Sequence, residues 1–156
     1  MKRILIGLAA VVMIASSAVA AEPWKILKTS AGAIWTNQSG MTLYVFDRDH
    51  RDRSSCYGQC EYVWPPFRAG ANARAIGEWT IVTRKDGTRM WAYDGHPLYT
   101  YIRDKRPGQV TGNSVYQFGA LWHVVRPGYK AGHYKAYRYG PYKAKSGGSY
   151  GSMSRY

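Results

Sequence analysis

The chain has 156 residues, a length that fits one small domain with short extensions and excludes two large domains. Apolar residues make up 46% of it, which is enough for a folded core and argues against a wholly disordered chain. Its 22 lysines and arginines outnumber its 9 aspartates and glutamates, and no acidic residue follows Asp104. The positive charge is therefore concentrated toward the C-terminal end.

The first 21 residues have the pattern of a signal peptide. A basic start, Met1–Arg3, precedes an apolar run from Ile4 to Ala15, and Ala18–Ala20 supplies the small residues that signal peptidase requires. Cleavage is expected after Ala20 or Ala21. The apolar run is shorter than the roughly 20 residues that cross a bilayer, so a membrane anchor is not favoured. The mature protein is expected to be periplasmic or secreted, with no transmembrane span.

The middle of the chain is predicted to be nearly all β. Asp86-Gly87 and Asp94-Gly95 favour tight hairpins, because glycine adopts positive φ without steric cost. Residues 79–101 should therefore form a three-stranded meander. No segment of the mature chain keeps a helical period over twelve or more residues. We expect a small antiparallel sheet or barrel-like domain over 22–126. Segments rich in β-branched and aromatic residues predict strands at 33–36, 42–46, 79–83, 89–93, 97–101 and 121–125.

An internal repeat organises these strands. Residues 40–49 align with residues 95–104, and the two copies share Gly, Leu, Tyr, Arg and Asp in register. One tryptophan precedes each copy and another follows it; these are Trp35 and Trp64 for the first copy, Trp91 and Trp122 for the second. The pattern predicts two related units, at about 32–67 and 86–123, that bury their aromatic faces against each other.

Both copies contain Tyr-x-(Phe/Trp/Tyr)-x-x-Asp, at residues 44–49 and 99–104. With Ser55–Cys60, Trp64–Pro66 and Trp91–Tyr99, this motif resembles the bacterial secreted-repeat family, whose members are predicted lipoproteins that carry it. The resemblance spans about 32–123 and implies an exported protein, but it carries no established activity. The chain departs from the lipoprotein pattern because it lacks a lipobox cysteine and has a long basic tail.

The motif residues have a structural and a functional interpretation. In the structural one, the aromatic side chains stack on one face of a sheet and the aspartate accepts backbone N–H bonds that fix the next turn. In the functional one, they form a platform for a sugar, a peptide or a cation. We favour the structural interpretation. The residues concerned are Tyr44, Phe46, Asp49, Trp64, Tyr99, Tyr101, Asp104 and Trp122.

Cys56 and Cys60 are the two cysteines of the chain. An exported protein with one even pair is predicted to form a disulfide, which would here close a short loop. The alternative is a periplasmic copper-binding or thiol-redox site, in which His50 and His123 would complete a ligand set with the two thiolates. Copper is the cofactor of that alternative; the main prediction has no cofactor and no metal.

The sequence contains no recognisable catalytic set. Ser54 and Ser55 lie near His50 and Asp52 in the chain, but nearness in sequence does not supply the base and orienting group that a nucleophile needs. No nucleophile elbow, phosphate loop or zinc protease helix occurs. We therefore expect a non-enzymatic protein.

The C-terminal tail, residues 127–156, has its own composition. It holds seven tyrosines, six lysines and arginines and no acidic residue, so it is predicted to be disordered. Alternating aromatic and cationic residues suit adhesion to anionic envelope polysaccharide or lipid headgroups, although a merely solubilising tail has the same composition. Nucleic acid would also suit these residues, but export argues against it. The sequence as a whole predicts an envelope-associated binding or structural protein.

Overall fold

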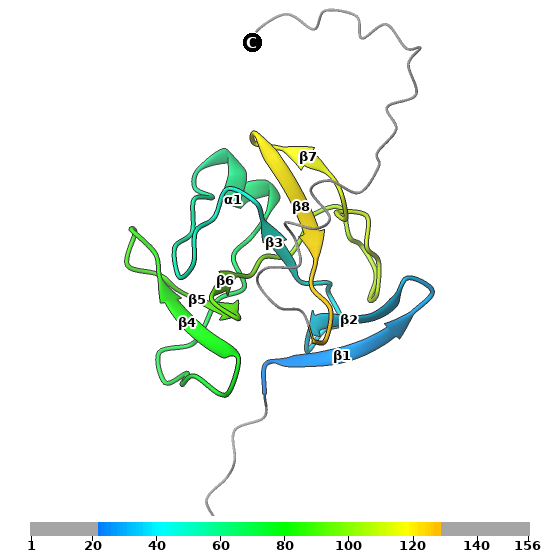
Figure 1. Cartoon of the computed structure of the whole chain (residues 1–156), viewed down its shortest axis with the longest axis horizontal. Helices are drawn as coiled ribbons and strands as arrows, with labels where there is room; N and C mark the ends of the chain where they lie inside the picture. The colour runs from blue at the N-terminus through cyan, green and yellow to red at the C-terminus, as the bar shows by residue number, and fades with distance from the viewer. Residues whose placement is uncertain (1–21, 129–156) are drawn as a thin grey trace, which may run out of the picture.

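The computed structural model describes residues 22–128. The expected signal peptide, 1–21, and all but the first two residues of the expected tail lie outside the described residues. Within 22–128 the protein is nearly all β, with three small antiparallel sheets and one short helix, which confirms the predicted fold class (Figure 1). No helix in this part of the chain is long and apolar enough to cross a membrane.

Each unit begins with a β-hairpin. In the first unit, β1 (Trp24–Thr29) pairs with β2 (Gly32–Asn37). In the second, β4 (Trp79–Thr83) pairs with β5 (Arg89–Tyr93), which also pairs with β6 (His96–Pro97). The strand order of the predicted meander is thus confirmed over residues 79–97, and its turns contain Gly87 and Gly95 at positive φ.

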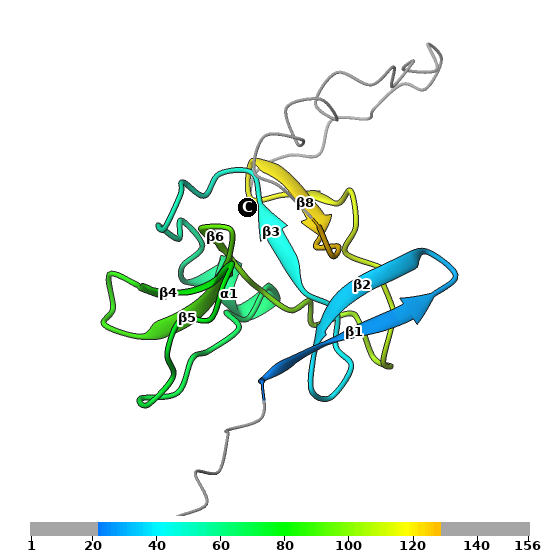
Figure 2. The same ribbon diagram turned by 60° about the horizontal axis from the view of Figure 1, so that its bottom comes forward.

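A third sheet joins the units. β3 (Tyr44–Phe46) pairs with β8 (Ala120–Val124), which pairs in turn with β7 (Tyr116–Gln117). Both views show β8, late in the sequence, alongside β3, with the two hairpins to either side (Figures 1 and 2). The short helix α1 (Gln59–Val63) follows the first motif.

The strand predicted at 97–101 is shorter than expected. Its ladder with β5 ends at Pro97, because the chain then leaves that sheet to pair with the other unit. Tyr99 forms isolated bridges with Tyr44 and Pro66 instead. The segment is extended, but it connects two units rather than continuing one sheet.

The last segment of each unit pairs with the hairpin of the other unit, so the two units exchange these segments. The N–H of Trp35 donates to the carbonyl of Val125 over 2.9 Å, and the N–H of Val125 donates to Leu43 over 2.9 Å. In the second unit Trp91 donates to Phe67 over 2.8 Å, and Phe67 donates to Leu98 over 2.8 Å. Each hairpin is therefore completed by the end of the other unit, in an approximately twofold arrangement.

Strand alternation divides the core into two clusters. Tyr44 and Phe46 belong to one cluster, whereas Leu43 and Val45 belong to the other, as the alternation predicts. The first cluster holds most motif aromatics and both cysteines. The second is built around four tryptophans from the two hairpins: Trp24, Trp35, Trp79 and Trp91.

Candidate functional site

The two motifs meet at the centre of the molecule and bond to each other. The Tyr44 hydroxyl donates to Asp104 Oδ2 over 2.7 Å, and the Tyr99 hydroxyl donates to Asp49 Oδ2 over 2.7 Å. Each tyrosine thus bonds the aspartate of the other unit. We call these four residues, Tyr44, Asp49, Tyr99 and Asp104, the lock. The lock joins the two repeats and is not a separate site within each repeat.

Each aspartate also fixes the turn that follows it. Asp49 Oδ1 accepts the N–H of Ser55 over 2.7 Å, and Asp104 Oδ1 accepts the N–H of Thr111 over 3.0 Å. Backbone acceptance by a carboxylate is the role that the structural interpretation assigns to these residues. The aspartates therefore tie a loop of one unit to a tyrosine of the other.

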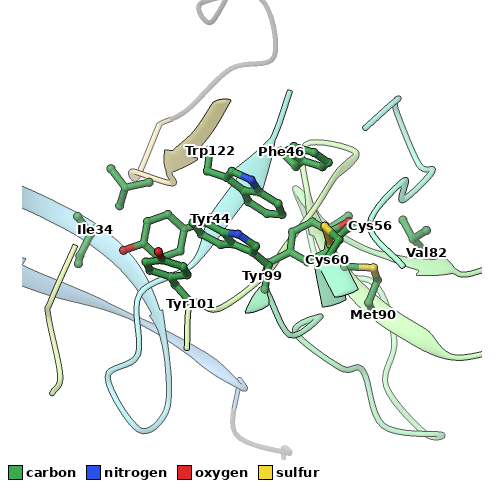
Figure 3. Packing of buried hydrophobic residues seen from close by; sticks show 13 residues of the cluster. Ile34, Tyr44, Phe46, Cys56, Cys60, Val82, Met90, Tyr99, Tyr101 and Trp122 are labelled. Carbon is green, nitrogen blue, oxygen red and sulfur yellow. A yellow bond between two sulfur atoms is a disulfide. The ribbon is translucent and has the colours of Figure 1, made fainter. Parts of the chain in front are cut away.

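The motif aromatics form a stack of four rings, which we call the aromatic stack. Phe46 lies on Trp122 with ring centroids 4.1 Å apart, Trp122 lies on Trp64 at 3.9 Å, and Trp64 lies on Tyr101 at 4.0 Å. The outer rings, Phe46 and Tyr101, occupy equivalent positions in the two units. The inner tryptophans, Trp64 and Trp122, are likewise equivalent. Figure 3 shows several of these side chains packed in the interior. The predicted burial of one aromatic face against the other is confirmed.

Burial decides how these aromatics act. Tyr44, Trp64, Tyr99 and Trp122 are all 0% exposed. A ligand could stack on them only if the units separated. Their rings therefore contribute to the packing of the domain interior.

The sequence did not reveal the partners of the tryptophan N–H groups. Gln117 accepts both: its side-chain Oε1 accepts Trp64 Nε1 over 2.9 Å, and its carbonyl accepts Trp122 Nε1 over 3.3 Å. The sequence also did not reveal a second symmetric stack, in which the rings of Trp24 and Trp79 are parallel and their centroids lie 3.9 Å apart. These tryptophans occupy the first position of β1 and of β4, and this shared position was a signal that could have found them.

One side of the lock carries an additional polar network. Arg84 Nη1 donates to Ser54 Oγ over 3.0 Å, and Ser54 Oγ is 2.7 Å from the Tyr99 hydroxyl. Since that hydroxyl gives its proton to Asp49, Ser54 donates to Tyr99. Arg84 and Ser54 are buried. The result is a continuous chain from Arg84 through Ser54 and Tyr99 to Asp49.

Arg84 is anchored on several sides. Its guanidinium forms an ion pair with Glu61 of α1 and lies 4.3 Å from the centroid of the Tyr57 ring. Its Nε is 3.5 Å from Asp86 Oδ2. Arg84 belongs to the second unit, whereas Tyr57 and Glu61 belong to the first. It therefore holds the cysteine loop against the other repeat, a role that no sequence motif indicated.

The burial of the lock alters its acid–base properties. Burial raises the pKa of Asp49 to about 7, although hydrogen bonds from Tyr99 and Ser55 oppose the shift. Burial also raises the pKa of Tyr44 and of Tyr99, and the neighbouring aspartates add to both shifts. The tyrosines remain protonated, while Asp49 titrates near neutrality.

The cysteines form the predicted disulfide. Cys56 and Cys60 are bonded, with Cα atoms 5.2 Å apart. His123 Nε2 lies 3.2 Å from Asp47, and the main chain of His50 bonds to that of Arg53. Among residues 22–128, no three His, Cys, Asp or Glu side chains form a group that could hold a metal ion.

The serines near His50 and Asp52 also have structural partners. Ser55 Oγ donates to the carbonyl of Arg48 over 2.9 Å, while Ser54 lies in the Arg84 chain. Ser54 Oγ accepts a hydrogen bond from Arg84 Nη1 and also one from the N–H of Cys56. These hydrogen bonds hold the backbone of the turn at Ser54 and Ser55 in place.

The fold and the lock define a protein of two interlocked β repeats. A family model described as a secreted repeat of unknown function matches residues 25–68 and 80–126, which is more than half of the chain. The chain belongs to this family, so the resemblance seen in the sequence is confirmed and the protein is a secreted repeat protein. No curated protein and no solved structure gave a significant match.

Proposed function

We propose that this protein is a non-enzymatic envelope protein that binds anionic cell-surface polymers through its basic C-terminal segment, in the periplasm or outside the cell. The observation that carries the proposal is the composition of residues 127–156, with seven tyrosines, six basic residues and no acid. Long-range attraction by such a segment requires no defined pocket.

The folded domain supports this proposal by the way its polar groups are used. The tyrosines and aspartates of the motif bond one another, and Ser54 is held between Arg84 and Tyr99. Polar groups that are already hydrogen-bonded to one another suit a stable domain that presents the tail better than they suit a reaction centre. In this proposal the domain presents the tail, and the tail makes the contact.

The test compares the full mature chain with a chain ending at Gly128. Binding is measured by co-sedimentation with vesicles containing phosphatidylglycerol, with phosphatidylcholine vesicles, and with an insoluble acidic polysaccharide. The Debye length falls from about 10 Å at 0.1 M salt to about 3 Å at 1 M. Full-length binding to the anionic materials should therefore weaken steeply with salt, and the truncated chain should bind less at 0.1 M.

Two controls make the result specific. Replacing the six tail lysines and arginines by glutamine should reproduce the truncation, whereas replacing the seven tail tyrosines by serine should leave most of the salt dependence. All forms should melt at similar temperatures, since both core clusters lie within 22–128. Equal and salt-insensitive binding by the full and truncated chains would remove the tail from the function.

A further inference from the structure

Two exposed turns of the folded domain share the residue order Arg-Asp-x-Arg. The first is Arg48-Asp49-His50-Arg51 and the second is Arg103-Asp104-Lys105-Arg106, and all six basic side chains are exposed. Lys28 of β1, by contrast, corresponds to Thr83 of β4, so exposed positions of the two repeats need not match. A shared order of arginines at solvent-facing positions therefore needs a reason other than the core.

The aspartate in each turn faces the interior and not the neighbouring basic residues. Asp104 is 3% exposed and bonds to Tyr44 and Thr111. Asp49 is half-buried and bonds to Tyr99 and Ser55. The outward side of the second turn is consequently positive, whereas in the first turn Arg51 is paired with Asp94 and Asp52.

Both turns are held in place by their surroundings. In the second, Gln109 Oε1 accepts the N–H of Lys105 and also that of Arg106, the latter over 2.9 Å. In the first, Arg51 packs so closely on Gly95 that a Cβ there would lie 2.8 Å from its Cγ. A fixed backbone lowers the ordering cost when the turn binds a partner.

We infer that these two turns, which we call the basic turns, are a pair of binding sites on the folded domain for a polymer with repeated phosphate groups. The inference rests on the proposed function for the anionic nature of the partner and adds where the domain itself contacts it. Arginine occupies two equivalent positions in each turn, and its planar guanidinium donates bidentate bonds to phosphate oxygens. Two sites on one rigid body favour a long polymer over a single phosphate group.

The second turn should contribute more than the first. Arg51 lies 3.6 Å from Asp94 and 4.0 Å from Asp52, so nearby acids offset part of its charge. Arg48 also donates to the carbonyl of Phe118 over 2.8 Å. The second turn carries Arg103, Lys105 and Arg106 around one inward-facing carboxylate. It is therefore the better target for substitution.

The experiment uses the full mature chain. Arg103→Gln, Lys105→Gln and Arg106→Gln are combined in one variant. The matched control combines Arg68→Gln, Arg74→Gln and Lys85→Gln, which removes the same charge from other exposed positions. Affinity is measured at 0.1 M salt for long-chain inorganic polyphosphate, for tripolyphosphate and for polygalacturonate.

The turn variant should bind long-chain polyphosphate about tenfold more weakly than the parent, and the control about threefold or less, because only the turn variant loses a site in a multivalent contact. Tripolyphosphate should bind weakly to all forms. Equal losses in the turn variant and the control would overturn the inference. Equal affinity of the parent for polyphosphate and polygalacturonate would overturn the assignment to phosphate.

A chain whose six tail lysines and arginines are replaced by glutamine separates this inference from the proposed function. If the tail alone binds, this chain loses binding and the turn variant matches the control, so the inference fails. If the basic turns alone bind, the tail variant matches the parent and the turn variant is weak, so the tail proposal fails. Melting temperatures of all variants confirm that they are folded.

Discussion

The main chains of Tyr44 and Tyr99 bond to each other in both directions, over 2.8 and 2.9 Å, at the point where the two repeats meet. Their side chains then diverge. In Figure 3 Tyr99 lies toward Cys56 and Cys60, whereas Tyr44 lies beside Tyr101. This central pair and the crossed Tyr–Asp bonds make the stability of each repeat depend on the other.

Removing one hydroxyl of the lock should therefore destabilise the whole domain. Tyr44→Phe leaves Asp104 Oδ2 buried without its donor, and a buried group left in that way costs about 1–3 kcal/mol. Tyr116→Phe is the matched control, because Tyr116 is 71% exposed, and it should change the free energy of unfolding by less than about 0.5 kcal/mol. Urea denaturation measures both. Equal stability of the two variants would show that the Tyr44–Asp104 bond contributes nothing net.

The stability of the domain should depend on pH through Asp49. The folded-state pKa is about 7 and the ordinary value is 3.8, so the folded state retains a proton that the unfolded chain releases between these values. The contribution of Asp49 is thus fully present below pH 3.8 and is lost as the pH rises through 7, with a slope of at most about 1.4 kcal/mol per pH unit. Asp49→Asn should flatten this part of the stability profile.

Carboxyl NMR of the folded protein provides the direct measurement for Asp49. Its side-chain resonance should titrate near neutral pH, well separated from the titration of the exposed Asp86, whose pKa is lowered by hydrogen bonds from Thr88. A midpoint for Asp49 near 3.8 would contradict the raised pKa.

Gly112 should tolerate no side chain. A Cβ at this position would lie 2.7 Å from the Trp64 ring and 3.0 Å from the Tyr101 ring, and both rings are fixed in the aromatic stack. Gly112→Ala is expected to cost about 1–3 kcal/mol through overpacking. Gly70→Ala is the control, since a Cβ there meets nothing within 4 Å. Thermal melts that shift equally for the two variants would contradict the close packing of Trp64.

The disulfide should add only a modest part of the stability. The cysteines are four residues apart, and a ring of this size reduces the entropy of the unfolded chain by about 2 kcal/mol at 25 °C in the chain-entropy account. Cys56→Ala combined with Cys60→Ala should thus lower the free energy of unfolding by about that amount and leave the domain folded. The parent should show no free thiol in a native thiol titration, and two free thiols would contradict the bond.

The sequence predicted two related units but not how they connect, and the predicted bounds of about 32–67 and 86–123 leave out β1 and β4. The amino-acid sequence shows that Tyr44 aligns with Tyr99 and Asp49 with Asp104. It also shows the strand alternation that places Leu43 and Tyr44 in different core clusters. An alignment states which residues are equivalent, however, and not which residue of one copy contacts the other. The crossing of the Tyr–Asp bonds therefore had no local signal.

Other elements were missed because their causes are not local. α1 spans Gln59–Val63, too short for a helical period to show, and β7 has two residues. β1 alternates weakly, because its exposed face includes Ile26. Arg84 looks like a surface cation in sequence, but in the interior Glu61 of the other unit pairs with its charge and Ser54 accepts a hydrogen bond from it.

The exchange of last segments has a consequence for how the chain can be cut and rejoined. Arg68 lies in the exchanged segment of the first unit, and Arg126 lies in the equivalent segment of the second. Residues 69–78 connect Arg68 to Trp79, and they begin with Ala69, whose N–H still donates to the carbonyl of Arg89 over 3.0 Å. A copy of the connector 69–78 joining Arg126 to Trp24 would therefore repeat a span that the chain already makes. A circular permutant opened within 69–78 should fold with the same lock, which is the behaviour expected of a homodimer whose two subunits became one chain by duplication and fusion.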